Sequence, residues 1–251
     1  IPERIYQENG GRLEAAYGAL PKTYCGYQRS SSRQTLIRRG IMTVEGFYRK
    51  YTGILHIPAD AKEWFQIPQG FLSVATNGAV FEDPYGEFTR RREYLLAYYP
   101  EDVIRKKLAA KTVAMAQAGQ YNYVRCCRRG EWESAYLAGG EFVRAALSVI
   151  YLLNKKYMPF YKWAFRGVDT LTELRNAAVD LKAFVRLEDS SKNAVQKRIL
   201  IESICNEIVC ELRKKGYSTS NGDFLEPHGS SIMSGIQDDW LRSLHVMADY
   251  D

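Results

Sequence analysis

Residues 141–163, EFVRAALSVIYLLNKKYMPFYKW, carry a row of side chains that could do chemistry. At helical spacing, one face of residues 141–157 collects an acid, a base, a hydroxyl, a phenol and a second base: Glu141, Arg144, Ser148, Tyr151 and Lys155. A carboxylate in such a row can accept a proton from a substrate hydroxyl, while neighbouring cations hold phosphate oxygens. We interpret this face as the wall of a site, with Glu141 as the candidate catalytic base.

A second group of residues around Tyr121 could contribute to the same kind of site, because it offers a stacking ring, an amide and a guanidinium fork. The predicted substrate-binding residues are Tyr121, Asn122, Arg125, Arg144, Tyr151, Lys155 and Lys162. Together they favour a nucleotide or a small polar substrate. The alternative is a core helix with a solvated outer face, because periodicity by itself fits both interpretations.

The elements that position these residues are predicted to be helices. Apolar residues recur at three- and four-residue steps from Phe142 to Tyr157, which predicts a helix that stops at Met158-Pro159. From Trp132 to Tyr157 the pattern fits either a pair of helices or one long helix. Upstream, residues 102–118 are predicted to form a helix that stops at Gly119. Further helices are predicted over residues 3–20, 89–99, 170–187 and 190–216, the third from a capping box at Thr170.

The only convincing strand in the sequence pattern is residues 41–45, IMTVE. An isolated strand needs sheet partners, and few are visible, so we expect further strands upstream. The absence of an initiator methionine at Ile1 also favours a missing upstream segment. We therefore predict a mainly α chain: a small α/β segment over residues 1–53 and a helical bundle over residues 54–251.

Composition narrows the function classes. The 251 residues include 46% hydrophobic and 25% charged residues, as in an ordinary globular protein, and the five cysteines lack metal-ligand spacing. No apolar run reaches the roughly 18 residues of a membrane span, so we predict a cytoplasmic protein with no membrane partner. Asp223, Glu226 and His228 could bind a metal, but a solvated loop is the favoured interpretation and no metal ligand is assigned.

The formal net charge of +6 favours anionic ligands such as nucleotides or phosphates. Nucleic-acid binding through the obvious cations ranks last among the hypotheses, because acidic residues are interleaved with them. Those cations are Arg90, Arg91, Arg92, Lys106, Lys107, Lys111, Arg128 and Arg129. Nucleic acid is therefore predicted to be an unlikely partner.

Several segments resemble a bacterial family of uncharacterised proteins: GIMTVEGFYRKYTG, ATNGAVFEDPYGEFTRRREYLLAYYPEDV, AMAQAGQYNYVRCCRRG, YLLNKKYMPFYKW and DDWLRSLHVMA. That family joins a nucleotidyltransferase domain, of the DNA polymerase beta and kanamycin nucleotidyltransferase type, to a helical domain of unknown function. The resemblance implies that residues 1–53 are the end of the first domain and that the rest is the helical partner. It also implies Glu141 as a base by its role and setting, without an aligned motif.

The sequence departs from the nucleotidyltransferase pattern at the metal site. Such enzymes carry Gly-Ser followed by an Asp-x-Asp pair that holds two magnesium ions on the nucleotide phosphates. Here Gly229-Ser230 is followed only by Asp238-Asp239, in a region predicted to be helical. Glu45, at the end of the predicted strand, is a candidate for a third carboxylate of that magnesium site. The favoured alternative is that Glu45 has no catalytic role. The resemblance implies Mg²⁺ and ATP for the intact protein, and this chain alone is predicted to be inactive.

Two functions follow from these observations. The first is the helical, substrate-binding part of a magnesium-dependent nucleotidyltransferase, with a nucleotide and a small-molecule acceptor as partners. The second is a non-catalytic helical module whose tyrosine-rich faces form a homodimer or bind another protein.

Overall fold

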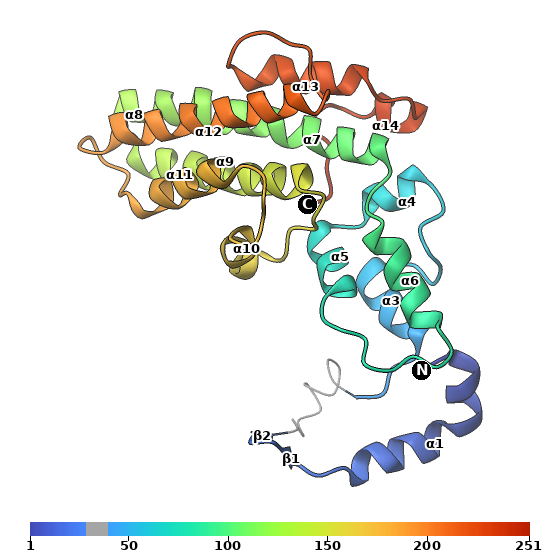
Figure 1. The fold of residues 1–251 in the computed structure, drawn as a ribbon. Helices are drawn as coiled ribbons and strands as arrows, with labels where there is room; N and C mark the ends of the chain where they lie inside the picture. Colours follow the sequence, from blue (N-terminus) through green and yellow to red (C-terminus); the bar gives the residue numbers. More distant parts are fainter. Residues whose placement is uncertain (29–39) are drawn as a thin grey trace. The chain divides into compact units, whose positions relative to one another are not determined.

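The computed structural model describes residues 1–28 and 40–251, and the fold is mainly α, as the sequence predicts (Figure 1). The chain divides into two compact units. One comprises residues 1–57 and 75–97, and the other comprises residues 58–74 and 98–251. All of the predicted site residues belong to the second unit.

In its described residues, the first unit contains three helices and a small hairpin. The elements are α1 (Glu3–Ala19), β1 (Thr23–Tyr24), β2 (Tyr27–Gln28), α3 (Val44–Thr52) and α6 (Glu87–Leu96). The helix predicted over residues 3–20 is therefore confirmed. β1 and β2 pair antiparallel, with Thr23 opposite Gln28. Tyr48 of α3 is buried, and its hydroxyl donates to the carbonyl of Phe88 at 3.1 Å, which ties α3 to α6.

The strand predicted over residues 41–45 is wrong, because a helix begins within it. Thr43 is the N-cap of α3, and its hydroxyl accepts a hydrogen bond from the Gly46 amide at 3.0 Å. Val44, Tyr48 and Thr52 then fall on one buried face at four-residue steps. Glu45 consequently lies in the first turn of a helix, without the strand setting that suggested a metal-binding carboxylate.

The second unit is a helical bundle. Its elements are α4 (Ala61–Gln66), α5 (Gln69–Thr76, of which residues 69–74 belong here), α7 (Glu101–Met115), η1 (Ala116–Tyr123), α8 (Val124–Arg129), α9 (Trp132–Leu153), α10 (Tyr161–Val168), α11 (Arg175–Arg186), α12 (Ala194–Lys214), α13 (Leu225–Ser234) and α14 (Asp239–Ser243). α7 packs against α9 and α13, and α11 packs against α12.

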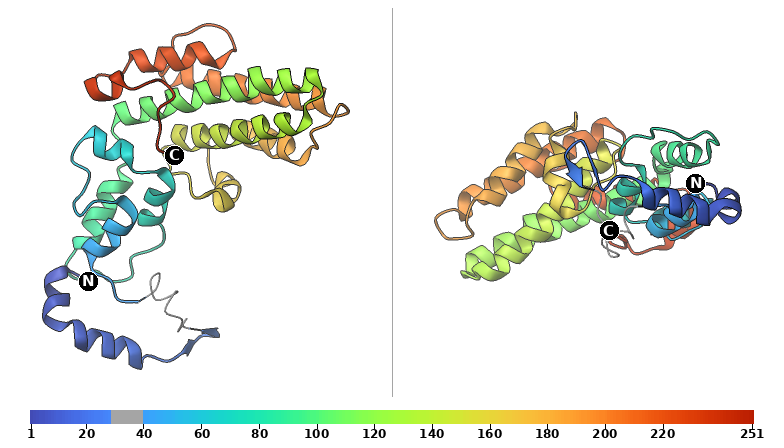
Figure 2. Two further views of the ribbon diagram at one scale, coloured as in Figure 1. Left: turned by 180° about the vertical axis from the view of Figure 1, so that it is seen from behind. Right: turned by 90° about the horizontal axis from the view of Figure 1, so that it is seen from below.

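Gly119 does not end a helix, contrary to the prediction. α7, the π-helical segment η1 and α8 continue as one rod from Glu101 to Arg129 (Figure 2). A Cβ atom at Gly119 would collide with the ring of Phe142 on α9. The glycine is there for close helix–helix approach, which sequence pattern cannot distinguish from a helix stop.

α9 confirms one continuous helix from Trp132, but the helix ends at Leu153, before Tyr157. It is long and apolar enough to cross a membrane, yet 61% of its most apolar window is buried inside the protein, as in the core helix of a soluble protein.

The predicted start of the next helix at Thr170 is also wrong, since α11 begins at Arg175. The Thr170 hydroxyl donates to the carbonyl of Gly167, so it closes the preceding turn and does not cap a helix.

Candidate functional site: a lysine and carboxylate cluster

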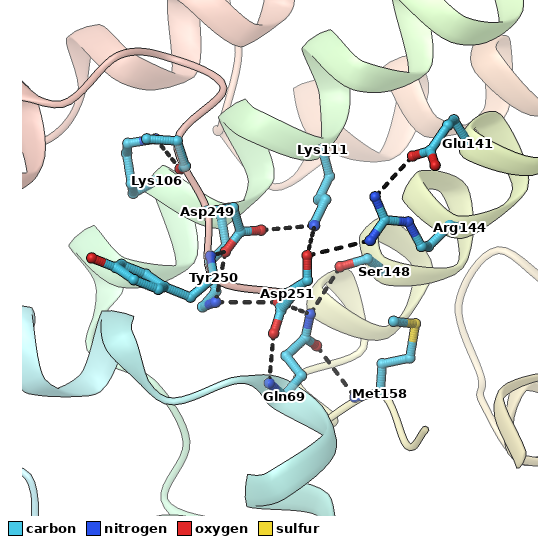
Figure 3. A network of polar contacts seen from close by, with 12 residues as sticks. Gln69, Lys106, Lys111, Glu141, Arg144, Ser148, Met158, Asp249, Tyr250 and Asp251 are labelled. Carbon is cyan, nitrogen blue, oxygen red and sulfur yellow. Dashed lines mark hydrogen bonds and ion pairs between the residues drawn. The ribbon is translucent and has the colours of Figure 1, made fainter. Parts of the chain in front are cut away.

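Three lysines of α7 bind the segment 246–251 in a buried polar cluster (Figure 3). The Lys107 ammonium lies 2.9 Å from Oδ1 of Asp249 and 3.1 Å from Oδ2 of Asp251. The Lys111 ammonium lies 2.9 Å from Oδ2 of Asp249. The Lys107 side chain is 0% exposed and both aspartates are 6% exposed, so these charges compensate one another away from water.

The cluster shifts the titration of its members. Burial alone would raise the pKa of Asp249, but the charges and hydrogen bonds of Lys107 and Lys111 outweigh it and hold that pKa at about 2. Burial likewise opposes the charge of Lys107, and the two aspartates raise its pKa nonetheless. Lys106 instead donates to two carbonyls, of Val246 at 3.0 Å and Ala248 at 2.7 Å, and burial lowers its pKa to about 8.

Gln69, at the start of α5, links the cluster to α9. Its backbone amide and its side-chain nitrogen donate to the two carboxylate oxygens of Asp251, at 2.6 and 2.8 Å. The same side-chain nitrogen donates to the hydroxyl of Ser148 at 2.8 Å, and the side-chain oxygen accepts from the Met158 amide at 3.2 Å. The Asp251 carboxylate therefore has two amide donors and one ammonium around it, a setting suited to any anionic oxygen.

Two of the predicted site residues lie at the edge of this cluster. Glu141 accepts a hydrogen bond from Arg144 at 2.8 Å, and Arg144 also reaches the backbone oxygen of Asp251 at 3.4 Å. Lys111 approaches that oxygen at 3.5 Å. The side chains of Glu141 and Arg144 are 64% and 59% exposed, so a ligand from solution has access to both. Lys111 of α7 and the pair Glu141 and Arg144 of α9 therefore meet at the Asp251 oxygen.

Other members of the predicted row point elsewhere. Ser148 and Tyr151 are buried. The Tyr151 hydroxyl donates to the carbonyl of Ala164 on α10 at 2.8 Å, and burial raises the pKa of Tyr151 to about 12. Lys155 is exposed beyond the end of α9, with a left-handed backbone of φ 50°, and Lys162 is exposed on α10. These predicted residues therefore lie in three places. Glu141 and Arg144 are at the exposed edge of the cluster, Ser148 and Tyr151 are inside the bundle, and the two lysines are on a separate surface.

The group around Tyr121 stays together on η1 and α8. Arg125 donates to the Tyr121 hydroxyl and lies 4.8 Å from the centroid of that ring, and Asn122 beside them is exposed. Tyr121 is ten residues along the same rod from Lys111, roughly 15 Å at the usual helical rise. Arg125 and Tyr121 thus form a surface distinct from the lysine cluster.

The solvated loop expected for Asp223, Glu226 and His228 is wrong in part, because Glu226 and His228 lie on α13, and each ring nitrogen of His228 has a partner within the protein. His228 is buried, with Nδ1 2.8 Å from the Ser218 hydroxyl and Nε2 3.1 Å from the Gly222 carbonyl. Burial lowers its pKa, which favours the neutral ring in this setting. Across residues 1–28 and 40–251, no group of three histidine, cysteine or acidic side chains is placed to hold a metal ion.

Sequence reasoning missed the acceptors and donors at the centre of the cluster: Gln69, Lys107, Lys111, Asp249 and Asp251. Lys107 and Lys111 enter the sequence analysis only as candidate cations for nucleic-acid binding. One feature of the sequence could have indicated their burial: they are four residues apart, with Leu108, Ala109 and Ala110 between them. A lysine on an apolar helix face is rarely buried without an acidic partner. The identity of that acid depends on a contact about 140 residues away, which no local pattern reveals.

Comparisons with known proteins give one finding. Residues 64–164 match the model of a family described as a domain of unknown function (DUF4037). No curated protein and no solved structure matches the chain. The matched range contains Gln69, Lys107, Lys111, Glu141 and Arg144 and stops before the 246–251 segment. Residues 64–164 are therefore similar to an uncharacterised domain family. This agrees with the part of the sequence resemblance that concerns a domain of unknown function.

Proposed function

We propose that this chain is the helical, substrate-binding part of a magnesium-dependent nucleotidyltransferase that acts on a small molecule. The resemblance of several segments to a family with that domain pairing supports the proposal. The observation that carries it is the convergence of Arg144 and Lys111 on one oxygen of Asp251, beside the exposed carboxylate of Glu141.

In this proposal Arg144 and Lys111 hold a phosphate oxygen, which would take the place of the Asp251 oxygen, and Glu141 accepts the proton of an acceptor hydroxyl. Tyr121, Asn122, Arg125, Lys155 and Lys162 supply outer contacts. Tyr151 acts from the interior by fixing α10. By the resemblance, the proposal assigns magnesium and ATP to the nucleotidyltransferase domain of the intact protein.

The experiment compares Glu141→Gln with Glu133→Gln, a matched exposed glutamate on the same helix, in the intact protein. We expect Glu141→Gln to lower turnover at least tenfold while nucleotide binding, measured by calorimetry with Mg²⁺, is retained. Glu133→Gln is expected to change neither. Unchanged turnover in Glu141→Gln would contradict the role of Glu141 as base.

A non-catalytic interaction module is the second candidate, and exposed apolar side chains favour it. Tyr136 and Leu137 on α9 are each 68% exposed, and Val179 on α11 and Val195 on α12 are 64% and 62% exposed. Tyr151 and Tyr157 are buried, so their substitution would test folding and not assembly. Sedimentation velocity of the parent and of Leu137→Ser tests the homodimer: a concentration-dependent dimer that Leu137→Ser abolishes would support it, and a monomeric parent would exclude it.

A further inference from the structure

The segment that connects α9 to α11 carries an aromatic and basic surface, of which the proposed function uses only Lys155 and Lys162. Residues 154–168 contain four cations and no acidic residue. We call the side chains concerned the α10 surface: Lys155, Lys156, Phe160, Tyr161, Lys162, Trp163 and Arg166. In Figure 1, α10 is the short helix that projects from the bundle next to α9.

The aromatic rings of this surface face solvent. Tyr161 is 89% exposed, Trp163 is 49% exposed and Phe160 is 40% exposed. All four cations of the segment are exposed as well. Lys162 and Arg166 lie over the Trp163 ring, 5.7 and 5.8 Å from its centroid, so two cations are held against this half-exposed ring. Exposure of so much aromatic surface is typical of a binding site.

The rest of α10 is fixed to the bundle. Ala164 and Val168 are buried, and the Ala164 carbonyl accepts the hydrogen bond from Tyr151. Gly167 approaches Tyr151 so closely that a Cβ atom there would collide with its hydroxyl. The Phe160 ring packs edge-on against Phe71 at 5.3 Å. The exposed rings and cations are thus presented on a rigid base, which limits the entropy lost on binding.

We propose that the α10 surface binds single-stranded nucleic acid, with unpaired bases stacked on Tyr161 and Trp163 and phosphates held by the surrounding lysines and Arg166. Stacking platforms bordered by cations are the general means by which proteins hold single strands. The positive charge of the segment is available to phosphates, because the segment has no acidic residue of its own. Asp169, the first acid after it, is paired with Lys182. This proposal concerns cations other than those the sequence analysis considered, of which Lys106, Lys107 and Lys111 are committed to the buried cluster.

Two other occupants fit the surface less well. An anionic membrane would require an apolar helix face free to enter lipid, but the apolar side of α10 (Ala164 and Val168) is packed within the bundle. A single free nucleotide requires an enclosing pocket for its affinity, and rings as exposed as Tyr161 form an open platform. A polymer gains affinity on such a platform by contacts with several phosphates and bases at once.

The test is fluorescence anisotropy of a labelled oligouridine RNA of about 12 nucleotides, a length typical of single-strand sites, and of the matching DNA. We expect binding at low salt that weakens steeply as salt rises. Tyr161→Ala and Trp163→Ala are each expected to weaken binding about 5- to 100-fold through lost stacking. Lys162→Ala is expected to reduce the salt slope by about one. Tyr136→Ala, an exposed tyrosine on α9, is the matched control and is expected to bind like the parent.

Urea unfolding of each variant checks that it is folded, so that a loss of binding reports on the surface itself. Absence of binding to both oligonucleotides at low salt would overturn the proposal. Equal loss in Tyr136→Ala and Tyr161→Ala would overturn it too, as would equal affinity for a duplex of the same length. Binding to vesicles that contain phosphatidylserine, without binding to the oligonucleotides, would assign the surface to a membrane instead. The experiment requires no catalytic activity, so its outcome is independent of the nucleotidyltransferase proposal.

Discussion

The two lysine groups of the helical unit differ in their partners and in their access to water. On α7, Lys106 and Lys107 are fully buried, and every ammonium of that group has a carboxylate or carbonyl oxygen within hydrogen-bond reach. Around α10, Lys155, Lys156 and Lys162 are exposed in a segment without acids. The same residue type thus stabilises a fold in one place and offers charge to a ligand in the other.

This contrast explains why composition alone misleads. A net charge of +6 counts both groups equally, although the α7 lysines are largely neutralised inside the protein and contribute little to its outer field. Burial also changes the cost of losing a charge, because the partner that remains has no water to replace it. Substitutions in the two groups are therefore expected to have opposite consequences for stability and for binding.

The largest expected effect is that of Lys107→Met. Removing this ammonium leaves the carboxylates of Asp249 and Asp251 buried with fewer partners, which should lower the free energy of unfolding by about 3–5 kcal/mol. Urea unfolding measures it, and Lys162→Met on α10 is the matched control, expected to stay within about 0.5 kcal/mol of the parent. Similar losses in both variants would remove the distinction between the two groups.

The acid sensitivity of the cluster is the next effect in size. The pKa of Asp249 is about 2 in the folded protein and about 3.9 in an unfolded chain, so its contribution is fully present above pH 4 and is lost as the pH falls towards 2. The difference corresponds to about 2–3 kcal/mol. The free energy of unfolding, followed from pH 5 to pH 2, should fall more steeply in the parent than in Asp249→Asn. Parallel curves would show that this carboxyl is not stabilised by the lysines.

The anchoring of α10 gives a smaller effect. Tyr151→Phe removes the buried hydroxyl that donates to the Ala164 carbonyl, at a cost of about 1–2 kcal/mol. Urea unfolding measures this loss. Tyr136→Phe, at an exposed position on the same helix, should cost close to nothing. An unchanged stability in Tyr151→Phe would mean that α10 is held by apolar contacts alone.

The smallest expected effect on stability is at the exposed edge of the cluster. Glu141 and Arg144 form an ion pair that is mostly exposed, so Glu141→Gln should change the free energy of unfolding by less than about 0.5 kcal/mol. Thermal unfolding checks this expectation. A large destabilisation would make Glu141 a structural residue and would weaken its assignment as a base.

Much of the bundle was accessible from the sequence. The apolar periodicity of α9 and α12 predicts helices, because a buried face at three- and four-residue steps is a local property of the chain. The helix over residues 3–20, outside the bundle, was predicted from a similar apolar spacing, although α1 buries none of its residues. The errors arose where one local sequence pattern is compatible with two structures. Thr43 begins a helix within a segment whose pattern is typical of a strand. Gly119 permits close helix packing, although a glycine at such a position often ends a helix.

The candidate site was predictable only in part. Glu141 and Arg144 meet because they are three residues apart on one helix, which the sequence by itself determined. Tyr151 shares that spacing but points into the bundle, because the position of α10 sets which side of α9 is covered. The partners of Lys107 lie more than 140 residues away, and only the tertiary structure brought them together. The sequence determined which side chains were available on each helix, and packing decided which charges were paired and buried and which remained open to a ligand.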